Sequence, residues 1–207
     1  MKPAILILTT GALLAAAPAL AHHPLGGEAP QSIVHGVLSG LAHPVIGIDH
    51  LAFVVLAGLA AAIAGRGLSG PLAFILATLA GTFIQLGGIA LPLAELVIAG
   101  SVVVLGALLV MGRQVGEPAA LGGFALAGLF HGWAYGEAVV GSTPMPIVAY
   151  LAGFAVIQFA IAAGVARLGG RLLARPEGAL QARLAAAVCA GVGLAFLVEA
   201  GEHLILG

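Results

Sequence analysis

Ionisable side chains interrupt an apolar stretch of the chain in the segment HPVIGIDH, residues 43–50. Two imidazoles and one carboxylate lie within it, those of His43, His50 and Asp49. Imidazole and carboxylate groups without a thiolate suit borderline divalent metals such as Ni²⁺, Co²⁺, Zn²⁺ and Cu²⁺. An ionisable group in hydrocarbon is costly, so it normally faces a partner or a water-filled cavity. The segment therefore predicts a metal-binding cavity within an apolar part of the protein.

Further imidazoles and carboxylates fall in two later apolar segments. His131 and Glu137 lie in FHGWAYGE. Glu199 and His203 lie four residues apart in EAGEH, a spacing that puts both on one face of a helix. At about 1.5 Å of rise per residue, His50, His131 and Glu199 lie about 18–23 Å from the helix ends that face one side of the membrane. Because three helices bring these groups to a similar height, we predict one shared metal site.

The spacing also separates ligands from accessory groups. His131 and Glu137 are six residues apart, about 9 Å of helical rise, so a regular helix cannot bring both to one ion. We therefore expect His131 to be a ligand and Glu137 to be a carboxylate at the entrance. Glu202 points partly away from the face that carries Glu199 and His203, and we expect it to be solvated or to contact a loop.

The composition is typical of a polytopic membrane protein. Of 207 residues, 61% are hydrophobic and only 7% are charged, whereas soluble domains have about 25% charged residues. A net charge of -1 argues against a nucleic-acid partner, which needs a basic surface. The chain has no phosphate-binding GxxxxGK[ST] motif, so we expect no nucleotide. The single cysteine, Cys189, excludes an intrachain disulfide and a CxxC metal site.

The first 21 residues have the pattern of a secretory signal. One lysine is followed by a short apolar run and an A-x-A motif that ends at Ala21. Cleavage there would leave residues 22–207 as a single six-helix transmembrane domain. His22 and His23 would then follow a free α-amine, and an amine with two imidazoles could capture a metal ion.

The rest of the chain predicts an all-α fold. A spanning helix needs about 20 mostly apolar residues, and turn-rich segments divide the chain into stretches of that length. Gly128, Gly132 and Gly136 recur every fourth residue, a pattern that lets two membrane helices pack closely. The predicted spans are six: 45–64, 71–90, 92–112, 119–138, 146–167 and 184–205.

Arginines occur only in the loops on one side of this topology. Arg66 follows the first predicted span and Arg113 follows the third. The positive-inside rule makes this side cytoplasmic, so both ends of the mature chain are expected in the periplasm of a bacterium, with the protein in the inner membrane. The remaining arginines lie around the loop between the fifth and sixth spans: Arg167, Arg171, Arg175 and Arg183.

Pro44 predicts a break in the first span. The residue before a proline avoids helical geometry, so we expect the helix to be broken near His43–Pro44, after a short helix in SIVHGVLSGLA. Irregular backbone at membrane depth is tolerated where it lines a cavity. His35 shares a face of the short helix with His43 and is a further candidate ligand.

Both motifs resemble those of the HupE/UreJ family, bacterial nickel and cobalt permeases. The family motif H-P-x-x-G-x-D-H is complete here, with Gly47 as its glycine. The second family motif is F-H-G-x-A-H-G-x-E, and FHGWAYGE is one residue shorter, with Tyr135 where the family often has histidine. Tyr135 is four residues after His131, where it can be a hydrogen-bond partner of that ring. The resemblance implies a permease for Ni²⁺ or Co²⁺ without a prosthetic group or enzymatic activity.

Two other functions stay open from the residues alone. Histidines and acids on several helices could hold Zn²⁺ with an open water position, as in an intramembrane zinc hydrolase. Paired histidines could also ligate a b-type haem. Metal flux into sealed vesicles distinguishes a permease from a hydrolase, and a Soret band would reveal haem. The expected partners are a divalent metal ion and the lipid bilayer, and a homo-oligomer is left open.

Overall fold

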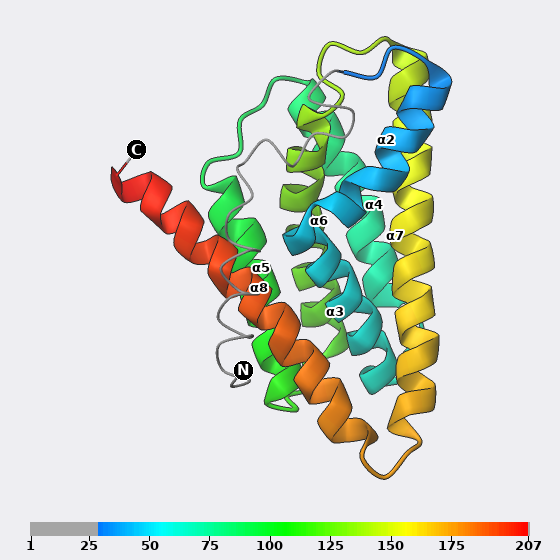
Figure 1. Ribbon diagram of the computed structural model, residues 1–207, viewed down its shortest axis with the longest axis vertical. Helices are drawn as coiled ribbons and strands as arrows, with labels where there is room; N and C mark the ends of the chain where they lie inside the picture. Colours follow the sequence, from blue (N-terminus) through cyan, green and yellow to red (C-terminus); the bar gives the residue numbers. More distant parts are fainter. Residues whose placement is uncertain (1–28, 207) are drawn as a thin grey trace, which may run out of the picture.

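The computed structural model describes residues 29–206, and this part of the chain is all-helical (Figure 1). The prediction of an all-α fold is confirmed for these residues. The predicted signal peptide, His22 and His23 lie outside them. The described helices are α2 (Ile33–Ile46), α3 (Ile48–Ala64), α4 (Ser69–Leu86), α5 (Ala94–Val110), α6 (Glu117–Glu137), α7 (Pro144–Leu173) and α8 (Gly178–Leu206).

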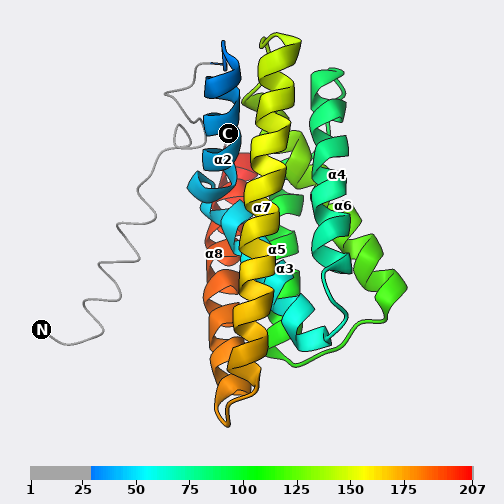
Figure 2. The ribbon, with the colours of Figure 1, turned by 90° about the vertical axis from the view of Figure 1, so that its right-hand side faces the viewer.

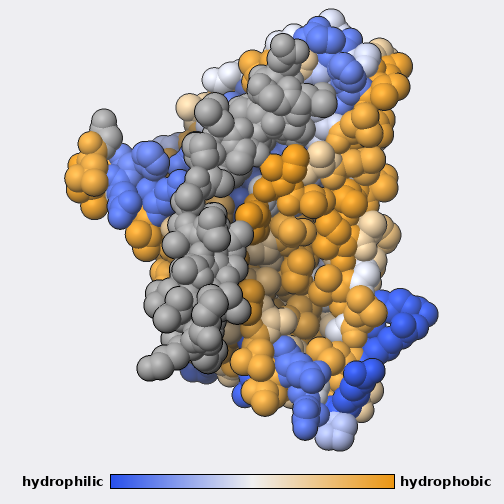
Figure 3. All heavy atoms as spheres, in the orientation of Figure 1, coloured by the Kyte–Doolittle hydropathy of each residue, from blue (hydrophilic) through white to orange (hydrophobic). Residues whose placement is uncertain are grey.

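Each of the six predicted spans coincides with a helix, but not every helix meets the requirements of a span. Of the described helices, α4, α7 and α8 are long and apolar enough to cross a membrane, and α2 with α3 makes a fourth if the bent pair counts as one span. Helix α5 is apolar but has only 17 residues. Hydrophobic residues cover the middle of the face in Figure 3, and hydrophilic residues gather toward its upper and lower ends. The protein is therefore a membrane protein, while its six-span topology stays a prediction.

The first span is broken at Gly47 rather than at His43–Pro44. Helices α2 and α3 meet there at an angle of 79°, and Gly47 has an extended ψ of 97°. The predicted break in the first span is therefore confirmed, but it lies three residues beyond Pro44, since His43 and Pro44 are both helical in α2. Close packing of α2 on α7 outweighs the local preference of the residue before proline. A side chain on Gly40, for example, would collide with the main-chain carbonyl of Tyr150 in α7.

Glycines bring the helices together in pairs (Figures 1 and 2). The predicted stripe on α6 packs against α4, where an added side chain on Gly132 would collide with the carbonyl of Thr78. Helix α5 packs on α8 in the same way, because a Cβ on Gly193 would lie 2.7 Å from the Cβ of Val102. Small residues at such contacts allow close backbone approach in lipid.

Helix α3 lies among these pairs and contacts α4, α5, α7 and α8. Its buried side chains form much of the apolar core, including Phe53, Val54 and Leu56. The bend at Gly47 sets the first turn of α3 inside the bundle, so that Asp49 and His50 are buried beside α6 rather than exposed at a helix end.

Candidate metal site

Four polar side chains are buried around the bend between α2 and α3. His43 lies in the last turn of α2, Asp49 and His50 lie in the first turn of α3, and His131 comes from α6. Their exposed fractions are 3%, 7%, 4% and 0%. Burial of this many ionisable groups is costly unless they are paired or face a cavity.

Three of these four residues form the floor of a polar cavity of about 470 Å³. Its mouth is made of exposed side chains from α5, α6 and α8, which include Glu95, Glu137 and Glu199. Six residues that the sequence predicted for one site therefore share one cavity, although they come from four helices. The residues that line this polar cavity are His43, Asp49, His50, Glu95, Ile98, Ala134, Glu137, Phe196, Glu199, Ala200 and His203.

The charge of the polar cavity favours a cation. It is lined by the carboxylates of Asp49, Glu95, Glu137 and Glu199, and no lysine or arginine of residues 29–206 is in its lining. The Oδ1 atom of Asp49 is buried and has no hydrogen-bond partner among the described residues. A buried carboxylate oxygen without a partner is costly, and a bound cation would compensate for it. The donor set therefore fits a divalent metal ion.

The floor is connected to α6 and α5 by a chain of hydrogen bonds. The Nδ1 atoms of His50 and His131 are 2.7 Å apart. The Nε2 atom of His131 is 3.0 Å from the hydroxyl of Ser101 in α5, which in turn donates to the carbonyl of Ile98 at 2.6 Å. Both ring nitrogens of His131 are thus occupied, and His131 is not among the residues that line the polar cavity.

The other histidine of the floor has a similar support. The hydroxyl of Tyr150 in α7 is 2.9 Å from Nδ1 of His43 and donates to the carbonyl of Tyr135 at 2.9 Å. His43 and Tyr150 belong to α2 and α7, which pack closely along their glycines. Each histidine of the floor is therefore held by a hydroxyl or an imidazole of another helix.

Comparison with known proteins identifies the family to which the chain belongs. The family described as HupE / UreJ protein matches residues 10–196. The chain is also 32% identical to Protein HupE of Rhizobium leguminosarum bv. viciae over 193 residues, 89% of this chain and 97% of that protein.

The chain belongs to the HupE/UreJ family. No solved structure gives a significant match. Membership supports a role in the transport or handling of nickel or cobalt, which the resemblance of the motifs implied.

Tyr135, which stands where the second HupE/UreJ motif often has histidine, makes contacts that the sequence did not predict. Tyr135 was predicted to bond to the ring of His131, and this is wrong, because the partners of His131 are His50 and Ser101. The Tyr135 ring instead packs on the imidazole of His50, with centroids 4.5 Å apart, and on that of His43, at 5.0 Å. Its hydroxyl is buried without a hydrogen-bond partner among the described residues.

Two further predicted residues of this HupE/UreJ protein lie apart from the floor. His35 is exposed on the first turn of α2 and does not line the polar cavity. Glu202 is exposed and also outside the lining, as predicted from its position on α8. Within residues 29–206, no three His, Cys, Asp or Glu side chains are arranged to hold one ion.

Sequence reasoning missed three residues of the site. Glu95 had a detectable signal, because it is a carboxylate at the start of an apolar helix on the side where the other acids lie. Ser101 and Tyr150 had none, since a hydroxyl in an apolar helix is common and their roles depend on contacts between helices.

Proposed function

We propose that this protein is a secondary permease that imports Ni²⁺ or Co²⁺ across the inner membrane of a bacterium. The observation that carries the proposal is the polar cavity, which has His43, Asp49 and His50 at its floor and acids at its mouth. Membership of the HupE/UreJ family supports the same role. Family membership is also consistent with a protein that is not an enzyme.

The mouth would collect the ion before it loses its water. Clefts lined by charges of one sign concentrate counter-ions and accelerate their association. Glu95, Glu137 and Glu199 lie at the mouth and are exposed, so a hydrated dication can reach them from solvent. These carboxylates act through long-range attraction, and their effect should weaken as ionic strength rises.

The floor would replace part of the hydration shell. The imidazole rings of His43 and His50 have their centroids 6.2 Å apart, and Asp49 adds a carboxylate oxygen that has no hydrogen-bond partner within the described part of the chain. Imidazole nitrogens with a carboxylate oxygen form a donor set that suits nickel and cobalt better than magnesium or calcium. Because no three such donors among residues 29–206 converge as they stand, ion binding by these residues requires a small rearrangement of their side chains or retained water ligands.

The orientation would assist uptake. With the arginine-rich loops in the cytoplasm, the mouth faces the periplasm and the chain ends are on that side. A dication that crosses a membrane potential of about 100 mV toward the negative side gains about 4.6 kcal/mol. This direction needs no nucleotide.

Reconstitution of the full-length protein in sealed liposomes tests the proposal. A metal-sensitive dye inside the liposomes would report entry of Ni²⁺ or Co²⁺ under an imposed inside-negative potential. We expect saturable influx that Asp49→Asn lowers by at least about tenfold, since loss of one partner of a buried charge pair costs about 2–5 kcal/mol. Glu202→Gln is the matched control, because it removes a carboxylate outside the polar cavity, and its flux should equal that of the unchanged protein.

The same liposomes separate this proposal from its competitors. Absence of Ni²⁺ and Co²⁺ influx in the unchanged protein would overturn the permease. Equal influx in Asp49→Asn and Glu202→Gln would mean that the metal site does not include Asp49. An intramembrane zinc hydrolase would bind Zn²⁺ at the floor without passing metal into the lumen.

A further inference from the structure

The hydrogen bond of Tyr150 determines which nitrogen of His43 carries a proton. The hydroxyl of Tyr150 has one proton and two partners, the carbonyl of Tyr135 and Nδ1 of His43, each at 2.9 Å. A carbonyl oxygen can only accept, so the hydroxyl proton is directed to Tyr135. The Nδ1 atom of His43 must then be the donor to the phenol oxygen. In the neutral ring this leaves the lone pair on Nε2.

The same reasoning applies to His50 through two links. The hydroxyl of Ser101 donates to the carbonyl of Ile98, so it accepts from Nε2 of His131. His131 is then protonated on Nε2 and accepts at Nδ1. Since the Nδ1 atoms of His131 and His50 are 2.7 Å apart, His50 donates from Nδ1 and has its lone pair on Nε2.

We propose that Tyr150, and Ser101 acting through His131, are positioning residues that hold His43 and His50 in their Nδ1–H tautomers, so that Nε2 of each ring binds the metal ion. The metal-binding part of this proposal rests on the proposed function. The tautomers themselves follow from the hydrogen bonds and exist without metal.

The tautomer matters because a neutral imidazole offers a metal only its unprotonated nitrogen. In the other tautomer Nε2 would carry a proton, and the ring would present a donor to the cation. Metal-binding histidines usually donate their second nitrogen to a protein acceptor, which sets ring orientation and raises ligand basicity, and loss of that acceptor lowers metal affinity about 10- to 100-fold. Here the two chains of hydrogen bonds end on main-chain carbonyls, Tyr135 and Ile98. A carbonyl oxygen has no proton to donate, so the direction of each chain of hydrogen bonds is fixed.

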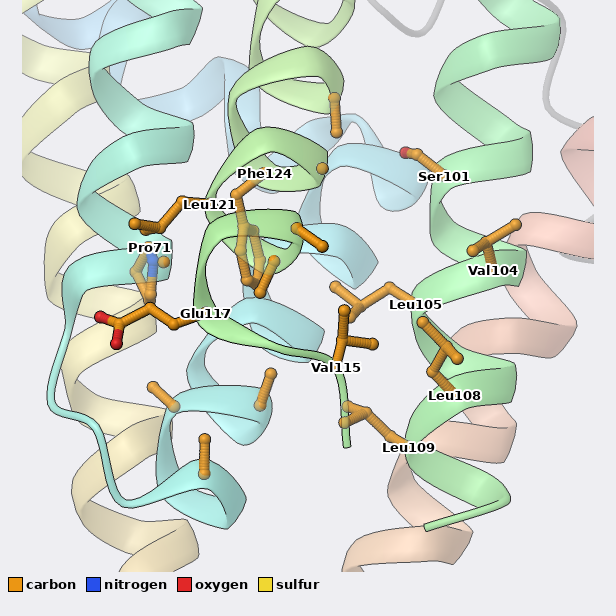
Figure 4. A pocket seen from close by; sticks show the side chains of 18 of the residues that line it. Pro71, Ser101, Val104, Leu105, Leu108, Leu109, Val115, Glu117, Leu121 and Phe124 are labelled. Atoms are coloured by element: carbon orange, nitrogen blue, oxygen red, sulfur yellow. The ribbon is translucent and has the colours of Figure 1, made fainter. Parts of the chain in front are cut away.

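The surroundings of Ser101 make its hydroxyl hard to replace. Ser101 also lines a second, largely apolar cavity of about 400 Å³ between α3, α5 and α6. Figure 4 shows Ser101 at the upper end of this cavity, on the same helix as Val104 and Leu105. Without the hydroxyl, Nε2 of His131 loses the acceptor that fixes its proton, and the largely apolar lining offers few side chains to replace it. In Ser101→Ala, His131 should therefore no longer be held in the tautomer that is protonated on Nε2.

Nuclear magnetic resonance of the metal-free, full-length protein tests the tautomers directly. Histidines labelled with ¹⁵N and ¹³C distinguish the Nδ1–H from the Nε2–H ring, and His43→Ala and His50→Ala assign the signals. We expect the Nδ1–H form for both rings. Tyr150→Phe should lower that population for His43 alone. Ser101→Ala should lower it for His50 alone, and Ser101→Thr, which keeps the hydroxyl, should restore it.

Two matched controls remove buried hydroxyls that do not bond to a histidine. Among the described residues, the hydroxyl that Tyr135→Phe removes has no hydrogen-bond partner, and the one that Thr78→Val removes bonds only to the carbonyl of Ile75. Neither should change the tautomer of His43 or His50. If either control shifts the tautomers as much as Tyr150→Phe or Ser101→Ala does, general disturbance of packing explains the effect and the proposal fails.

Metal binding by the same variants completes the test. Titration with Ni²⁺ or Co²⁺ should show affinity about 10- to 100-fold lower in Tyr150→Phe and Ser101→Ala. In uptake measurements, the metal concentration for half-maximal uptake should rise, and the maximal rate should change less. Unchanged tautomers in both variants would overturn the proposal, whatever the unchanged protein transports. Shifted tautomers in a protein that binds neither ion would leave the positioning intact and refute the proposed function instead.

Discussion

The Nδ1 atoms of His50 and His131 lie 2.7 Å apart, although the two residues are 81 positions apart in the chain. This contact joins the motif at the start of α3 to the motif on α6. It puts His131 behind the floor of the polar cavity rather than on its surface. The two HupE/UreJ motifs thus build one site by bonding to each other, and only the first presents its histidines to the cavity.

Neutralisation of Glu137 should weaken uptake mainly when metal is scarce. Its carboxylate is exposed at the mouth of the polar cavity, where a charge contributes about 1 kcal/mol or less. For Glu137→Gln we expect the half-saturating metal concentration to rise about fivefold or less, with the maximal rate preserved. Initial rates across metal concentrations measure both values. Glu117→Gln, an exposed acid at the other end of α6, is the control, and equal loss at low and saturating metal would instead indicate a part in translocation.

A methyl group on Gly47 should displace the ring of His50. The added Cβ would lie 2.6 Å from Cδ2 of that ring, whereas the φ of Gly47, -71°, is open to any residue. Gly47→Ala should therefore fold but bind Ni²⁺ or Co²⁺ at least about tenfold more weakly, as expected when a ligand loses its orientation. Calorimetric titration gives the affinity, and a thermal melt verifies folding. Gly164→Ala, which meets nothing within 4 Å, should bind normally, and normal binding by Gly47→Ala would contradict the assigned geometry.

Cysteines on α8 should report which side chains face the polar cavity. In a Cys189→Ser background, Glu199→Cys and His203→Cys would line the cavity while remaining exposed. A membrane-impermeant thiol reagent should label both, and Ni²⁺ or Co²⁺ should slow the reaction severalfold by occupying the cavity. Glu202→Cys is exposed but outside the lining, so metal should leave its labelling rate unchanged. Equal protection at all three positions would mean that the metal effect is not local.

Replacement of Gly132 by alanine should separate α4 from α6. The new Cβ would collide with the carbonyl of Thr78, and overpacking of this kind costs about 1–3 kcal/mol. We expect a lower unfolding temperature in detergent and, because His131 is the neighbouring residue, weaker metal binding. Gly122→Ala on the same helix meets nothing within 4 Å and should not lower the unfolding temperature. An unchanged melt for Gly132→Ala would show that the two helices can move apart at little cost.

Much of the candidate site could be predicted from the sequence because depth along a helix is proportional to residue number. Apolar stretches bounded by turn residues defined the positions of the helices, and the heights of His50, Glu137 and Glu199 followed from helical rise. That is why six residues from distant segments share the polar cavity. Glu95 lies in the first turn of α5 on the same side as the other acids, so the same arithmetic could have included it.

The direction in which each side chain points was decided by the tertiary structure. The break at Gly47 depends on the packing of α2 on α7, and no preference of Pro44 alone could locate it. His131 has the right height for a ligand, yet its two nitrogens are directed to His50 and Ser101. Helical rise determines height, but the rotation of each helix about its axis is set by packing against its neighbours. Contacts such as that of Tyr150 with His43, 107 positions apart, exist only once those rotations are set.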